Sequence, residues 1–135
     1  MSAVISTRGL AKSYGDTKAL RPTDVEIPLG RVVGVIGANG AGKTTMLNCI
    51  LGLLSYEGEL SVLGREPYKD RSQLMHEVSY IADVATLPRW MKVGQVLDFV
   101  EGVHPKFDRA ACEARLTKTK VRKDARIRTL SKGML

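Results

Sequence analysis

Hydrophobic residues follow two different spacings along the chain, and these spacings predict strands in its first part and helices in its last part. Residues 4–10, 24–27 and 60–63 have the pattern of strands. Residues 31–36 (R-V-V-G-V-I) and 78–82 (V-S-Y-I-A) have the composition of buried parallel strands. Since two antiparallel strands precede a strand–loop–helix unit, the pattern predicts a mixed sheet.

Helical spacing is clearest near the C-terminal end. Apolar residues at positions 93, 96, 97, 100 and 103 form one stripe, which predicts a helix over 93–103. Asp108 has the chemistry to cap a next helix from 109 to about 119. We also expect a helix over 44–51 and the end of another at 73–76.

A glycine-rich stretch joins the strand predicted at 31–36 to the helix predicted at 44–51. Residues 37–44 (G-A-N-G-A-G-K-T) fit the phosphate-binding pattern G-x-x-x-x-G-K-[ST] at every fixed position. The glycines allow a tight fold in which successive N–H groups converge on phosphate oxygens, and the helix N-terminus adds a partial positive charge. Lys43 would reach the β- and γ-phosphates, and the Thr44 hydroxyl suits Mg²⁺. The expected phosphate contacts are Gly37, Asn39, Gly40, Ala41, Gly42, Lys43, Thr44 and Thr45.

The alternative for this stretch is a glycine-rich turn without a ligand. Four fixed positions and the correct flanks together favour a phosphate site, because glycine makes up only about 7% of an average chain.

Composition indicates an ordinary globular domain. The chain has 135 residues, of which 44% are hydrophobic and 26% charged. No apolar run approaches the roughly 20 residues that span a bilayer, and the first residues do not resemble a signal peptide. We therefore expect a cytosolic protein. Cys49 and Cys112 have no metal-ligand spacing and are expected to be free thiols.

Charge is unevenly distributed. The net charge is +7, and residues 115–132 hold eight basic side chains against the single acid Asp124. Such a run could meet nucleic acid or an anionic membrane surface. It lacks the interleaved aromatic residues that stack on bases, so a solvated face is the preferred interpretation.

Four landmarks occur in the order typical of one family. Tyr14 in K-S-Y-G resembles an aromatic residue that stacks on adenine, and residues 37–44 are the P-loop. V-S-Y-I-A-D (78–83) resembles the strand leading into a Q-loop, and L-S-K-G-M (130–134) resembles the signature L-S-G-G-Q. The chain therefore resembles, over essentially its whole length, the N-terminal part of an ATP-binding cassette (ABC) ATPase. P-K-F-D (105–108), together with L-S-K-G-M, looks most like subunits that serve ABC-2-type exporters.

The resemblance implies an α/β P-loop NTPase fold of the ABC ATPase type, with ATP and Mg²⁺ as ligands. Thr44 would hold Mg²⁺ and Tyr14 would stack on adenine; a turn aromatic covering apolar surface is the alternative for Tyr14. In the family, two cassettes pack head to tail, so Ser131, Lys132 and Gly133 would meet a nucleotide bound to a second ABC ATP-binding subunit. Without a partner, Ser131 would simply begin a helix. Membrane-spanning permease subunits complete the system, which implies a peripheral place on the inner face of the cytoplasmic membrane.

The sequence also departs from the family. Asp83 stands where the Q-loop glutamine is usual; it could hold Mg²⁺ through water or simply end a strand. Lys132 stands where the signature has glycine. The sequence stops just inside the signature, so the family's Walker B strand, catalytic glutamate and switch histidine have no counterpart in it. We therefore expect a truncated cassette that binds nucleotide without sustained hydrolysis, although a complete member is an ATPase.

The resemblance also predicts the domain organisation. Residues 1–135 would be the N-terminal part of one ABC nucleotide-binding domain, with a nucleotide-binding core at about 1–90 and the start of a helical signature subdomain at about 91–135. Three alternative functions stay open: another P-loop protein such as a small-molecule kinase, a basic nucleic-acid-binding module, and an inert fragment. We do not expect nucleic acid as a partner.

Overall fold

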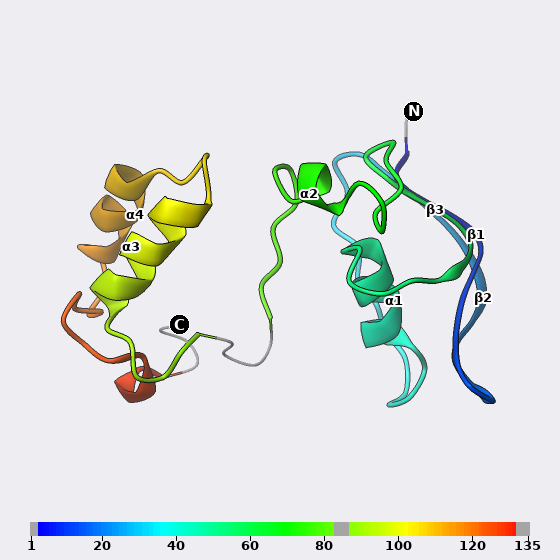
Figure 1. Cartoon of the computed structure of the whole chain (residues 1–135), viewed down its shortest axis with the longest axis horizontal. Coiled ribbons are helices and arrows are strands. Elements are labelled where there is room, and N and C mark those ends of the chain that lie inside the picture. The colour runs from blue at the N-terminus through cyan, green and yellow to red at the C-terminus, as the bar shows by residue number, and fades with distance from the viewer. Residues whose placement is uncertain (1–2, 83–86, 132–135) are drawn as a thin grey trace. The chain divides into compact units, whose positions relative to one another are not determined.

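The computed structural model describes residues 3–82 and 87–131. The chain divides into two compact units, residues 1–79 and residues 80–135, and each is described by itself. Figure 1 shows the strands and the first two helices in the first unit, and the later helices in the second.

A three-stranded antiparallel sheet forms the first unit. Strands β1 (Ala3–Tyr14) and β2 (Thr17–Pro28) make a hairpin, and β3 (Glu57–Val62) pairs with the other edge of β1, which gives the order β2-β1-β3 (Figure 1). The three strands predicted at 4–10, 24–27 and 60–63 are confirmed. The first two are longer than predicted because the hairpin continues their pairing as far as the turn at Gly15 and Asp16.

The hydrophobic core of this unit lies between the sheet and two helices. Helix α1 (Lys43–Ile50) confirms the helix predicted at 44–51, and the short α2 (Arg71–Leu74) ends two residues earlier than the segment predicted at 73–76. Each element contributes apolar side chains that its spacing turns inward. The buried cluster consists of Leu10, Leu20, Cys49, Ile50, Leu60, Val62 and Leu74.

Two predicted strands are wrong. Residues 31–36 and 78–82 form no strand, and no described strand pairs with them. Val32 and Ile36 are 104% and 98% exposed, although their composition is typical of a buried strand. A parallel strand is stable only when neighbouring strands satisfy its backbone groups and helices cover both its faces. The sheet of the described residues is accordingly antiparallel rather than mixed.

Helices dominate the second unit. Helix α3 (Val93–Val103) has the predicted bounds, and α4 (Arg109–Leu116) begins where predicted but ends earlier. The Asp108 carboxylate accepts a hydrogen bond from the Ala111 amide at 2.8 Å and caps α4, as predicted. A 3₁₀ turn, η1 (Ile127–Thr129), follows.

Two kinds of contact join the elements of this unit. Val93, Leu97 and Ile127 form a small buried core, against which Cys112 and Leu116 of α4 pack. Arg109 lies within 3.2 Å of carboxylates on α3 and α4 and so ties the two helices together; its partners are Asp98, Glu101 and Glu113. Within the described residues, no helix is long and apolar enough to cross a membrane.

Candidate phosphate-binding site

The glycine-rich loop between residues 37 and 42 leads directly into α1. Gly40 and Gly42 have φ angles of 84° and 92°, in the left-handed region that side chains rarely adopt. The Ala41 amide donates to the Ala38 carbonyl at 3.1 Å, and the Met46 amide donates to the Gly42 carbonyl at 2.8 Å. The first bond closes a turn within the loop, and the second is the first hydrogen bond of the helix.

The first turn of α1 leaves three amide groups unused. The N–H groups of Lys43, Thr44 and Thr45 donate to no described residue, and no side chain caps the helix. Helix N-termini of this kind attract anions, because the free N–H groups and the helix dipole both favour negative charge. The exposed Thr44 hydroxyl also has no partner among the described residues.

Lys43 folds back across the loop. Its Nζ donates to the carbonyl oxygens of Gly37 at 2.6 Å and Ala38 at 2.8 Å. The ammonium group therefore lies at the loop that the motif uses to cradle phosphate. Gly37 leaves room for this arrangement, because an added Cβ would lie only 3.2 Å from the Ala41 Cβ and 3.8 Å from the Lys43 side chain.

A hollow of about 430 Å³ lies between the loop and the β1–β2 hairpin. Two segments that are far apart in the sequence supply its walls: the start of β2, and the loop with the first turn of α1. The hairpin wall consists of Thr17, Lys18 and Ala19, and the loop wall of Asn39, Gly40, Gly42, Lys43, Thr44 and Thr45.

Sequence reasoning missed the hairpin wall. Thr17 and Lys18 belong to no motif, and only the turn of the hairpin places them beside the loop. Lys18 adds a second positively charged residue to the lining of the hollow. A positive lining strengthens the attraction of the site for a polyanion.

Tyr14 ends β1 at the edge of this site. It pairs across the hairpin with Thr17, which lines the hollow, while Tyr14 itself is not among the lining residues. Tyr14 is 51% exposed, and the Lys12 ammonium lies 5.2 Å from the centroid of its ring. An exposed aromatic ring close to the hollow is able to stack on a flat ligand group.

The other predicted site residues lie outside the first unit or outside the described residues. Ser131 is exposed and belongs to the second unit. Asp83, Lys132 and Gly133 lie outside the described residues. The described lining of the hollow thus contains the phosphate loop but no carboxylate, and Tyr14 lies next to it through its pairing with Thr17.

The unused amides, the ammonium of Lys43 and the Thr44 hydroxyl fit a nucleotide di- or triphosphate with Mg²⁺, because each group matches one part of that ligand. Together the loop, helix and hairpin define a P-loop nucleotide-binding domain. The chain belongs to the ABC transporter family: residues 20–135 match the family described as "ABC transporter".

Curated relatives and a solved structure agree with this assignment. The chain is similar to "Phosphonates import ATP-binding protein PhnC 1" of Natronomonas pharaonis, with 30% identity over 96% of this chain and 59% of the relative. It is 38% identical to "Nod factor export ATP-binding protein I" of Cupriavidus pinatubonensis over 53% of this chain and 22% of the relative. A solved "ATP binding subunit of ABC transporter" superposes with a TM-score of 0.79 at 23% identity, over 97% of this chain and 57% of that one.

The predicted fold class is therefore confirmed: the chain has the P-loop NTPase fold of ABC ATPase domains. The chain spans less than two thirds of the length of each of these proteins. One relative is named for import and the other for export, so the names do not settle a direction of transport.

Proposed function

We propose that the chain is the nucleotide-binding part of an ABC transporter ATP-binding subunit. The observation that carries the proposal is the convergence of three unused amides at the start of α1 with the Lys43 ammonium on one hollow. The three amides are free to donate to an anion, and the adjacent Lys43 ammonium adds a full positive charge for it.

Each residue of the site takes one part of the ligand. The free amides of residues 43–45 contact the phosphates together with the loop residues predicted between 37 and 42, and Lys43 exchanges its bonds to Gly37 and Ala38 for the β- and γ-phosphate oxygens. The Thr44 hydroxyl holds Mg²⁺, which neutralises phosphate charge when bound. Tyr14 stacks on the adenine ring. The signature residues Ser131, Lys132 and Gly133 keep the roles that the family resemblance implies, and Asp83 keeps its two alternatives, a hold on Mg²⁺ through water or the end of a strand.

The complete protein would work with partners. We propose a second ATP-binding subunit, packed head to tail, and membrane-spanning permease subunits, with the protein on the inner face of the cytoplasmic membrane. Nucleotide binding would favour the closed pair of subunits and hydrolysis would reopen it. Export is the proposed direction, and it rests on the motifs P-K-F-D and L-S-K-G-M alone. About 1–90 would form the nucleotide-binding core and about 91–135 the start of the helical subdomain.

Isothermal titration with Mg·ATP tests the proposal. Charge-assisted hydrogen bonds contribute about 1.5–3 kcal/mol each, so Lys43→Ala should weaken binding at least about tenfold. Lys120→Ala removes the same charge from an exposed position in the second unit and should leave the affinity unchanged. Equal affinities of wild type and Lys43→Ala would refute the proposal.

A further inference from the structure

Lys12 and Tyr14 lie two residues apart on β1, so their side chains leave the same face of the strand. The Lys12 Nζ lies over the Tyr14 ring, 5.2 Å from its centroid. The same nitrogen donates a hydrogen bond to the Ser55 Oγ at 3.0 Å. One ammonium group therefore connects the exposed end of the hairpin to the segment that follows α1, 43 residues away in the sequence.

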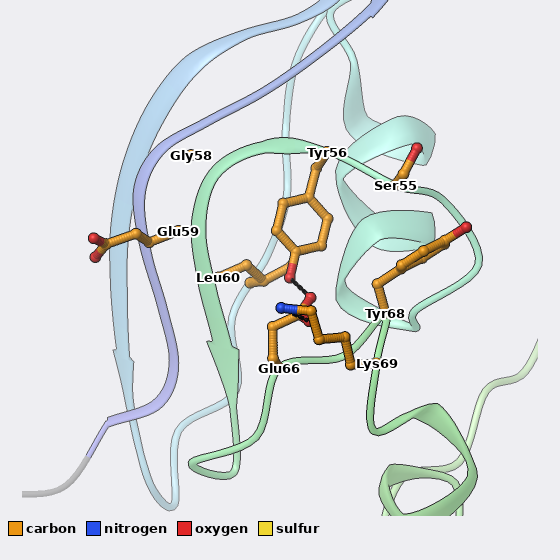
Figure 2. A pocket seen from close by; sticks show the side chains of 8 residues that line it. All are labelled: Ser55, Tyr56, Gly58, Glu59, Leu60, Glu66, Tyr68 and Lys69. Atoms are coloured by element: carbon orange, nitrogen blue, oxygen red, sulfur yellow. Dashed lines mark hydrogen bonds and ion pairs between the residues drawn. The ribbon is translucent and has the colours of Figure 1, made fainter.

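The segment that holds Ser55 is itself anchored. The next residue, Tyr56, packs against the core of the first unit and donates a hydrogen bond from its hydroxyl to the Glu66 carboxylate (Figure 2). Lys69 Nζ lies 3.4 Å from the second oxygen of that carboxylate. Figure 2 shows Ser55 beside Tyr56 at the start of this segment, ahead of β3. Ser55 therefore offers Lys12 a hydroxyl on the residue next to Tyr56, which the contact with Glu66 anchors.

We propose that Lys12 is a positioning residue that holds the Tyr14 ring ready for the base of the nucleotide. The proposal rests on the proposed function, because it needs Tyr14 to stack on the base. The ammonium covers one face of the ring, and the half-exposed side chain presents its other face to the ligand. A ring that is held before binding loses less side-chain freedom when the base arrives, which strengthens the interaction. Lys12 itself touches no phosphate-binding residue among its described contacts.

Two ligands separate this role from a simple charge effect. Mg·ATP uses both the base and the phosphates, whereas Mg·tripolyphosphate uses the phosphates alone. The affinity of the chain for each is measured by titration at about 150 mM salt, where distant surface charges are largely screened. The quantity of interest is the ratio of the two affinities.

Lys12→Met keeps the aliphatic stem and removes the charge, so the ratio should fall about two- to fivefold, the range of an exposed cation–π contact. Lys12→Arg keeps a cation over the ring and should restore the ratio. Ser55→Ala should lower it in the same direction, because the ammonium loses its anchor. Lys120→Met is the matched control for net charge and should leave both affinities unchanged.

In a Tyr14→Ala background, Lys12→Met should have no further effect on the ratio, because the ring that Lys12 positions is gone.

Three results would overturn the inference: an unchanged ratio in Lys12→Met, an equal loss for both ligands, or a Lys12 effect that persists without Tyr14. Each of these leaves the proposed function intact, because wild type still binds both ligands. If wild type binds neither ligand, the proposed function fails and the positioning role fails with it. The outcomes are therefore distinguishable in one series of titrations.

Discussion

Gly42 lies so close to the hairpin that a Cβ placed on it would come within 2.6 Å of the Ala19 carbonyl oxygen. The loop and the hairpin therefore approach each other through glycine at the point where α1 begins. Ala19 and Gly42 both line the hollow, so their close approach forms part of its wall.

Gly42→Ala should consequently destabilise the first unit. The added methyl group meets a backbone carbonyl, and the φ angle of 92° is unfavourable for alanine, so the expected loss is about 1–3 kcal/mol in free energy of unfolding. Gly40→Ala is the matched control: its φ angle is 84°, but its Cβ would meet nothing within 4 Å. Urea unfolding followed by circular dichroism should show a clearly larger loss for Gly42→Ala. Equal losses would mean that the approach to Ala19 contributes nothing.

Tyr14→Ala should reduce the affinity for Mg·ATP by roughly 0.5–1.5 kcal/mol, because the aromatic face supplies the stacking interaction. Tyr14→Phe should have little effect, since the hydroxyl forms no hydrogen bond to a described residue. Calorimetric titration of wild type and of the two variants with Mg·ATP measures these affinities. A large loss in the phenylalanine variant, or none in the alanine variant, would assign Tyr14 a different role.

Low pH should reduce the free energy of unfolding of the first unit, because it protonates the Glu66 carboxylate. The hydrogen bond from Tyr56 lowers the pKa of the Glu66 carboxyl below its ordinary value of 4.5, and the nearby Lys69 acts in the same direction. A carboxyl with a lowered pKa in the fold stabilises the protein above its unfolded pKa, and this stabilisation is lost as the pH falls through the folded pKa.

The free energy of unfolding should thus decrease less in Glu66→Gln than in wild type between about pH 6 and about pH 3. Glu59→Gln is the control, because Glu59 is an exposed carboxylate on β3 without a partner among the described residues. For wild type and for each variant, the change in unfolding free energy between these two pH values is measured and compared. Identical acid sensitivity in wild type and Glu66→Gln would contradict the prediction.

Residues 31–36 should make the 135-residue chain self-associate, because contiguous apolar side chains are exposed next to unpaired backbone groups. The double variant Val32→Thr/Ile36→Thr should bind less apolar dye and sediment with a smaller average mass. Leu53→Thr, which changes a single exposed apolar residue elsewhere in the same unit, should have a much smaller effect. A wild-type chain that sediments as a monomer without dye binding would show that this segment is protected in solution.

We expect no sustained ATP hydrolysis by the 135-residue chain. Phosphoryl transfer requires several groups to converge on the reacting phosphate and water. The described site supplies a phosphate loop, Lys43 and the Thr44 hydroxyl, but no carboxylate to orient the water. Phosphate release under multiple-turnover conditions should therefore match that of Lys43→Ala. Turnover clearly above this variant, and persisting through further purification, would contradict the expectation.

Local features of this protein could be predicted from the sequence because each depends on residues close together in the chain. The apolar stripe of α3 repeats at helical spacing, and Asp108 caps α4 through an amide three residues away. The phosphate loop belongs with them, since its glycines, Lys43 and the helix start occupy eight consecutive residues. Their chemistry needs no knowledge of the rest of the molecule.

Only the tertiary structure could decide which segments pair as strands and which residues enclose the hollow. The composition of residues 31–36 indicates a strand, yet a strand exists only where a partner offers hydrogen bonds, and composition does not report whether one is present. The hollow likewise needs the hairpin to bring Lys18 next to the loop, and the Lys12 ammonium reaches Ser55 across 43 residues. Such contacts depend on the path of the whole chain. The free energy of forming them includes the entropy lost when the residues between the two partners become ordered.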